Sequence, residues 1–188
     1  MPPEERRAHI LDAAIVLIAE HGSAVTTRQI ADAAGIAEGT VFRAFADKDA
    51  LIDAAIARVM DPADTIGVLE EIDPTLPLDA KVGRIVEVLH RRVGEVVAFM
   101  AALGPREHAR HHHSDKDGRR PPLGETTEAV VRLLAPDAHR LRVPLSTAVE
   151  YLRILVFGTS MPFLTTGDAS DPEEIADFIL RGIAKEGD

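Results

Sequence analysis

The chain has 188 residues, of which 46% are hydrophobic and 28% charged, and its formal net charge is −10. This size and hydrophobic content allow a packed core and argue against global disorder. Cysteine is absent, which excludes a disulfide framework, a thiolate metal site and a cysteine nucleophile. The sequence has neither an apolar run as long as a membrane span nor the apolar stretch of a signal peptide. We therefore expect a cytoplasmic protein that makes no membrane contact.

The N-terminal segment predicts two short helices in succession. Apolar residues recur at helical spacing from about residue 5 to residue 20, and His21-Gly22 ends that pattern. Thr26 followed by Gln29 is a capping-box pattern, in which side chain and backbone satisfy each other's unpaired groups at a helix start. The second helix is expected to run from there to Ala34.

Gly35 indicates a tight turn between the second helix and a third. The third helix is expected over about 38–44, with Val41 facing inward and Phe45 just beyond its end. Asp47 is a good N-cap for a fourth helix over 47–60. Two short helices joined by a glycine turn are the plan of a helix-turn-helix, whose second helix enters the DNA major groove.

The rest of the chain predicts further helices separated by polar breaks. Pro62 and the segment 72–79 interrupt the pattern, with a short helix or turn at most between them. Helices are expected over about 79–103, 125–135 and 145–164, and a last one begins at Asp171-Pro172. The polar segment 104–124 predicts an exposed loop. Because strand-like alternation and internal repeats are absent, the predicted fold class is all-α.

The charge of the first 60 residues limits how the protein can bind DNA. Nine acidic residues outnumber six basic ones there, so this segment has a net charge of about −3. Phosphate contacts are local, since salt screens charges beyond about 10 Å. Non-specific DNA affinity should therefore be modest, and the few basic groups must share one face.

Residues 10–55 carry two motifs, ILDAAIVLIAEHG and TTRQIADAAGIAEGTVFRAFADKDAL. They resemble the tetracycline-repressor (TetR) family of bacterial transcriptional regulators in the glycine turn, the GTVFRAF helix and the DKDAL start of helix four. The resemblance implies a homodimer whose C-terminal domain binds a small molecule and releases DNA. Accordingly we expect a helix-turn-helix domain over 1–46 and a helical effector-binding and dimerisation domain over 47–188, with helix four, 47–60, linking the two.

Seven residues are candidates for DNA contact. A hydroxyl and a guanidinium at the start of the second helix can hold a phosphate, and an arginine in the third can bond a guanine edge. A lysine in the first turn of helix four can neutralise a phosphate, and the glycine lets the backbone approach DNA. The candidates are Thr27, Arg28, Gly39, Thr40, Phe42, Arg43 and Lys48.

Three residues depart from the family pattern and bear on the operator that is read. Ala37 stands where a serine-like cap is frequent, so the third helix begins less firmly. Phe42 replaces a common tyrosine and cannot donate a hydrogen bond. Glu38 would repel phosphate unless it accepts from a cytosine amino group.

Two further residue sets are expected in the helical body, although each member is individually as consistent with plain core. An effector pocket for a small, largely apolar ligand would be lined by Leu89, Val93, Val96, Phe99, Met100, Leu103, Leu133, Tyr151, Phe157 and Met161. A homodimer interface of the last two helices would contain Leu152, Leu155, Val156, Ile175, Phe178 and Ile179.

Alternative functions have less support. His108 and His112 are spaced as metal ligands on a helix, but the cations around them oppose a divalent ion, so we favour a solvated loop and expect no metal or cofactor. An enzyme is disfavoured because no G-x-S-x-G motif is complete. The alternative that stays open is a helical protein-interaction module with weakened or lost DNA binding, which the acidic first segment supports. The expected function is an effector-released repressor that binds a palindromic DNA operator.

Overall fold

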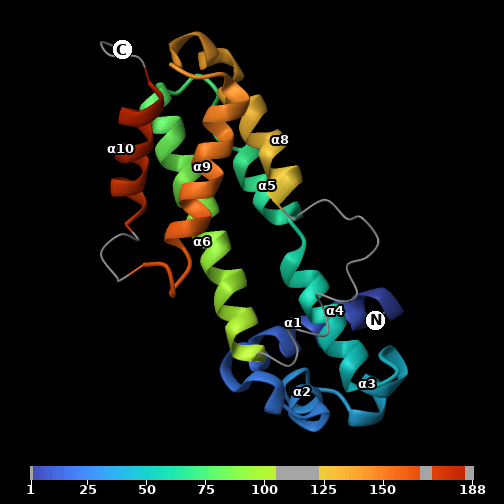
Figure 1. Ribbon diagram of the computed structural model, residues 1–188. Helices are drawn as coiled ribbons and strands as arrows, with labels where there is room; N and C mark the ends of the chain where they lie inside the picture. Colours follow the sequence, from blue (N-terminus) through green and yellow to red (C-terminus); the bar gives the residue numbers. More distant parts are fainter. Residues whose placement is uncertain (1, 105–122, 166–170, 185–188) are drawn as a thin grey trace. The chain divides into compact units, whose positions relative to one another are not determined.

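The computed structural model describes residues 2–104, 123–165 and 171–184 (Figure 1). Within these ranges the chain forms helices, and β pairing is limited to an isolated antiparallel bridge between Leu141 and Ala184. The predicted all-α fold class is therefore confirmed. None of the described helices is both long and apolar enough to cross a bilayer. The predicted loop at 104–124, with His108 and His112, lies outside the described residues apart from its two ends.

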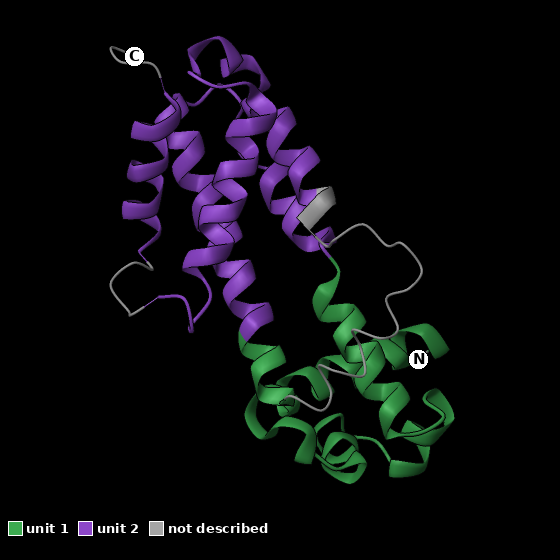
Figure 2. Ribbon diagram, viewed as in Figure 1, with its two compact units in different colours: residues 1–61, 98–119 green, residues 62–97, 120–188 purple. Residues whose placement is uncertain are grey.

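The chain divides into two compact units (Figure 2). The first comprises residues 1–61 and 98–119, and the second comprises residues 62–97 and 120–188. The long helix α6 (Leu78–Leu103) therefore contributes its last residues to the first unit. The functional domains expected over 1–46 and 47–188 remain a prediction.

The first unit contains α1 (Pro3–His21), η1 (Gly22–Ala24), α2 (Thr27–Ala33), α3 (Glu38–Ala44) and α4 (Lys48–Met60). Local sequence signals explain these bounds. The Thr26 hydroxyl accepts from the Gln29 N–H at 3.2 Å, and Gln29 Oε1 accepts from the Thr26 N–H at 2.8 Å, which completes the predicted capping box. Asp47 caps α4 by accepting from the Ala50 N–H at 2.7 Å.

Both predicted glycine breaks adopt positive φ. Gly22 has φ 63° and ψ −152°, and its N–H bonds to Ile18 O at the end of α1. Gly35 has φ 65° in the turn between α2 and α3. Residues that carry a Cβ atom rarely adopt these conformations, so glycine suits both positions.

The core of the first unit joins all its helices. Ile10 and Ile18 of α1, Ile30 of α2, Val41 of α3 and Leu51 of α4 are almost fully buried in it. The cluster also contains two residues from the end of α6, namely Phe99 and Leu103. The last turn of α6 is thus part of the same core as the helix-turn-helix.

The second unit contains α5 (Ala63–Glu70), the rest of α6, α8 (Leu123–Leu134), η3 (Ala135–Arg140), α9 (Leu145–Thr159) and α10 (Pro172–Ile183). The expectation that α9 reaches residue 164 is wrong, because the helix ends at Thr159. Pro162 explains the early end, since proline lacks an N–H and disfavours a helical conformation at the residue before it. Asp171 caps α10 as expected, accepting from the Glu173 N–H at 2.9 Å.

A buried ion pair lies within the second unit. Lys81 is 1% exposed, and its Nζ donates to the Asp137 carboxylate and, at 3.0 Å, to the Pro74 carbonyl. Burial opposes ionisation of Asp137, but the hydrogen bond and charge of Lys81, aided by Arg140, outweigh it and hold the pKa of Asp137 below its usual value. The pair connects α6 to η3, and the bond to the Pro74 carbonyl adds the segment before α6.

Candidate nucleic-acid interface

The recognition helix α3 is held by one face and exposes the other. Val41 is 1% exposed, and Phe45, four residues later, is also buried. Residues four apart share a helix face, so this pair anchors α3 to the core. Phe42 is 51% exposed and Arg43 is exposed on the remaining surface. The start of α3 has no side-chain cap at Ala37, as the sequence predicts.

Two residues of α1 bind the C-terminal ends of both helices of the helix-turn-helix. The Arg7 guanidinium donates to Ala44 O at 2.6 Å and lies 4.1 Å from the centroid of the Phe45 ring. His9 Nε2 lies 3.0 Å from Ala34 O. Carbonyls at a helix end have no partner within the helix, so these contacts satisfy them and fix the orientation of α2 and α3.

The structure brings the seven predicted DNA-contact residues into one unit, all of them wholly or partly accessible. Arg28, Gly39, Phe42 and Arg43 are exposed, whereas Thr27, Thr40 and Lys48 are half-buried. A Cβ placed on Gly39 would meet no atom within 4 Å, so the surface there is open to an approaching backbone. The role of these residues in DNA contact stays a prediction.

Two of the seven already have partners within the chain. The Thr27 hydroxyl donates to Glu38 Oε1 at 2.7 Å, which joins the first residues of α2 and α3. Lys48 Nζ donates to Ser23 O at 2.6 Å and keeps two further N–H groups for other acceptors. Sequence reasoning did not anticipate these bonds, nor those of Arg7 and His9, because their partners are set by tertiary packing.

The ten residues predicted for an effector pocket fall into separate surroundings. Phe99 and Leu103 are buried in the core of the first unit, while Leu89 and Leu133 are buried in that of the second. The others range from the buried Val93 and Met161 through the half-buried Val96 and Met100 to the exposed Tyr151 and Phe157. The pocket assignment stays a prediction, and the structure does not gather these residues around one cavity.

His90 lies on α6 and has one ring nitrogen shielded from solvent. Its Nε2 is shielded from solvent and has no hydrogen-bond partner among the residues that the structure describes. A buried polar atom without a partner costs about 1–3 kcal/mol. This nitrogen is therefore available to a ligand that offers a complementary group.

Four of the six residues predicted for a dimer interface are buried within the chain's own core, namely Leu152, Val156, Ile175 and Ile179. Leu155 is partly buried, whereas Phe178 is 68% exposed. The large apolar side chains that α9 exposes are others: Tyr151, Ile154 and Phe157.

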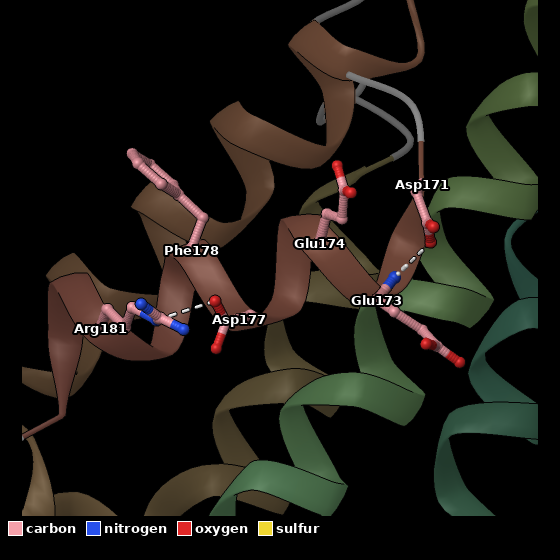
Figure 3. Close-up of a pocket in the computed structure, with 6 residues that line it drawn as sticks. All are labelled: Asp171, Glu173, Glu174, Asp177, Phe178 and Arg181. Carbon is pink, nitrogen blue, oxygen red and sulfur yellow. Dashed lines mark hydrogen bonds and ion pairs between the residues drawn. The ribbon is translucent and has the colours of Figure 1, made fainter. Parts of the chain in front are cut away.

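Figure 3 shows Phe178 on α10 beside an open hollow with several charged groups. Asp177 and Arg181 form an ion pair at 2.8 Å on the same helix. The hollow is lined by Asp171, Glu173, Glu174, Asp177, Phe178 and Arg181. Within the described ranges no three His, Asp or Glu side chains are placed to hold a metal ion.

Comparison with known proteins supports the predicted family. Residues 10–55 match the model of "Bacterial regulatory proteins, tetR family". The HTH-type transcriptional repressor LfrR of Mycolicibacterium smegmatis is 36% identical over 98 residues, which cover 52% of this chain and 50% of that protein. The HTH-type transcriptional repressor KstR2 of Rhodococcus jostii is 41% identical over 68 residues, 36% of this chain and 32% of that protein.

A solved structure extends the likeness of fold to the whole chain. NalD of Pseudomonas aeruginosa, described as the secondary repressor of the MexAB-OprM multidrug efflux pump, has a TM-score of 0.56 and 20% identity, and the match covers 98% of this chain and all of that chain. By contrast, the matched segments span half or less of the two curated relatives. These two curated relatives therefore match at most about half of this chain in sequence.

Proposed function

We propose that the chain is a member of the tetR family of bacterial regulatory proteins, whose model matches residues 10–55, and that it is a transcriptional repressor that reads operator DNA with α3. The observation that carries the proposal is the two-sided α3, which anchors Val41 in the core and exposes Phe42 and Arg43. An anchored helix with free polar and aromatic side chains is what major-groove recognition requires.

The proposed repressor acts as a homodimer on a palindromic operator. α9 and α10 pack together and expose Tyr151, Ile154, Phe157 and Phe178 to solvent. Exposed apolar surface of this kind is stabilised when a second copy covers it, and the last two helices of two copies can form a four-helix bundle. The two copies of α3 would then occupy successive major grooves about 34–36 Å apart.

A small, largely apolar effector would release the proposed repressor from DNA. The unpartnered His90 Nε2 supports a ligand site in the second unit, since a single buried polar atom suits an apolar ligand with one polar group. Release requires that the effector bind the DNA-free conformation more tightly than the DNA-bound one.

Alanine at Arg43 and alanine at Lys48 should weaken DNA binding in different ways. Loss of Arg43 should relax the preference at one base pair and cost about 1–3 kcal/mol on the preferred duplex, whereas loss of Lys48 should weaken binding to all sequences alike and flatten the salt dependence. Fluorescence anisotropy with duplexes selected from a random library, at several salt concentrations, measures both effects.

The matched control is Arg84→Ala, which removes an exposed arginine from α6 in the second unit and should leave DNA binding unchanged. If Arg43→Ala and Lys48→Ala both bind DNA like the wild type, the assignment of Arg43 and Lys48 to DNA contact is wrong. If the wild type retains no duplex even at low salt, the protein-interaction module becomes the better interpretation.

Glutamate at Phe178 should weaken self-association. Phe178 is 68% exposed and already has Glu174 and Asp177 close by in sequence, so a further carboxylate would have to be buried among like charges in the bundle. We expect the dimer dissociation constant in analytical ultracentrifugation to rise at least about tenfold, which corresponds to about 1.4 kcal/mol. Val16→Glu is the control, because Val16 is similarly exposed but lies on α1. An equal effect of both variants would argue against an α10 interface.

A further inference from the structure

We propose that Glu38 is a specificity-determining residue that reads a cytosine amino group, and that its hydrogen bond with the Thr27 hydroxyl in the DNA-free protein keeps that hydroxyl from donating to phosphate. This inference rests on the proposed DNA-binding function and adds a mechanism to it. Glu38 is the first residue of α3 and is exposed on the same unit as Phe42 and Arg43.

A hydrogen bond joins Thr27 and Glu38 in the DNA-free protein. The two residues are eleven positions apart, and the hydroxyl donates to Glu38 Oε1 at 2.7 Å. A threonine hydroxyl has one proton, so while it is donated to Glu38 it cannot be donated to a phosphate oxygen. Thr27 is therefore engaged in the free protein by an acceptor that is itself negatively charged.

The charge of Glu38 also sets the response to DNA of the wrong sequence. An ionised carboxylate accepts hydrogen bonds and donates none, so it repels phosphates and the acceptor edge of guanine. In the major groove it can accept from the N4 amino group of cytosine. A duplex with cytosine at the facing position offsets the cost of bringing this carboxylate to DNA, because N4 is a donor with no acceptor beside it on the same base.

The two contacts are linked by an exchange of hydrogen bonds. To reach the cytosine amino group the Glu38 carboxylate turns away from Thr27, and the Thr27 hydroxyl can then donate its proton to a backbone phosphate. A correct base thereby frees a phosphate contact that an incorrect base leaves occupied. The exchange lowers non-specific affinity and widens the difference between correct and incorrect sequences.

Selection of duplexes from a random library, with the full-length wild type and with Glu38→Gln, tests the proposal. Glutamine retains the length of the side chain, loses the charge and pairs with the N6 and N7 atoms of adenine. We expect cytosine at one position for the wild type and adenine at that position for Glu38→Gln. Affinity of the variant for a mixed-sequence duplex at low salt should rise about fivefold, because one negative charge near the phosphates is removed.

Glu20→Gln is the matched control, since it removes a carboxylate that is also exposed, from α1 within the same unit. It should leave the selected sequence unchanged. The same base at every position for wild type and Glu38→Gln, or no gain in affinity for the mixed-sequence duplex, would overturn the role of Glu38 while the regulator proposal stands. Failure of the wild type to enrich any sequence would overturn both.

Discussion

Replacing Lys81 by methionine is expected to lower the free energy of unfolding by about 3–5 kcal/mol. Methionine retains most of the buried volume, so the decrease in the free energy of unfolding arises from the lost charge and not from a cavity. Asp137 would remain buried with only Arg140, at 3.4 Å, as a charged neighbour, and the Pro74 carbonyl would lose its donor. Urea unfolding followed by circular dichroism, at a fixed protein concentration, measures the change.

Two further variants separate the effect of burying an unpaired charge from the effect of losing an ion pair. Arg132→Ala breaks the exposed pair with Glu70, which has an N–O distance of 2.8 Å, and should cost less than about 1 kcal/mol. The double variant Lys81→Met with Asp137→Leu removes both buried charges and should recover most of the loss. A loss for Lys81→Met as small as that for Arg132→Ala would contradict this account.

The pH dependence of the Lys81→Met effect has a defined sign. The pKa of Asp137 is lower in the folded wild type than in the unfolded chain, so its ionised form stabilises the fold above the unfolded pKa. That contribution is lost as pH falls through the folded pKa. In the variant, a protonated Asp137 no longer needs a cation, so the difference between the two proteins should shrink below about pH 4.

Alanine at Gly22 is expected to destabilise the first unit by about 3 kcal/mol or more. The φ and ψ angles of Gly22, 63° and −152°, are close to a region that glycine alone populates, and such strain costs about 1–3 kcal/mol. In addition, a Cβ there would lie 2.3 Å from the carbonyl oxygen of Ala102 in α6. That atom belongs to the backbone, so it cannot move without displacing Phe99 and Leu103 from the core.

Gly35→Ala is the matched variant for Gly22→Ala. Gly35 also has positive φ, at 65°, but a Cβ there would meet nothing within 4 Å. Gly35→Ala should therefore lower the free energy of unfolding only by the conformational cost of about 1–2 kcal/mol. Thermal unfolding of both variants separates the two contributions, and equal losses would show that the approach of Ala102 to Gly22 does not matter.

The described helices follow closely from local sequence signals. The Thr26–Gln29 capping box, the Asp47 cap and the turn at Gly35 act over a few residues, and the structure contains all three. The end of α9 was misjudged because its apolar pattern continues past Thr159, while the conformational effect of Pro162 outweighs that pattern. Periodicity showed which faces are apolar but not which neighbours cover them.

The accessibility of the candidate residues could be predicted from the sequence, but their contacts within the chain could not. Arg28, Phe42 and Arg43 are exposed on the helix-turn-helix, in agreement with the expected groove-facing surface. The bond from Thr27 to Glu38 and the bond from Arg7 to Ala44 O span 11 and 37 positions. Contacts between residues this far apart in sequence depend on how α1, α2 and α3 pack, and that packing cannot be derived from one sequence alone.

The amino-acid sequence by itself determined the helical class and the capped helix-turn-helix, which carries the resemblance to the tetR family, because these features depend on short-range periodicity, capping and turn chemistry. Only the tertiary structure decided that Lys81 is buried against Asp137, that Phe99 joins the core of the first unit, and that α9 and α10 leave Tyr151 and Phe178 exposed. These features depend on side chains that meet across long stretches of chain, where the packed backbone selects the partner.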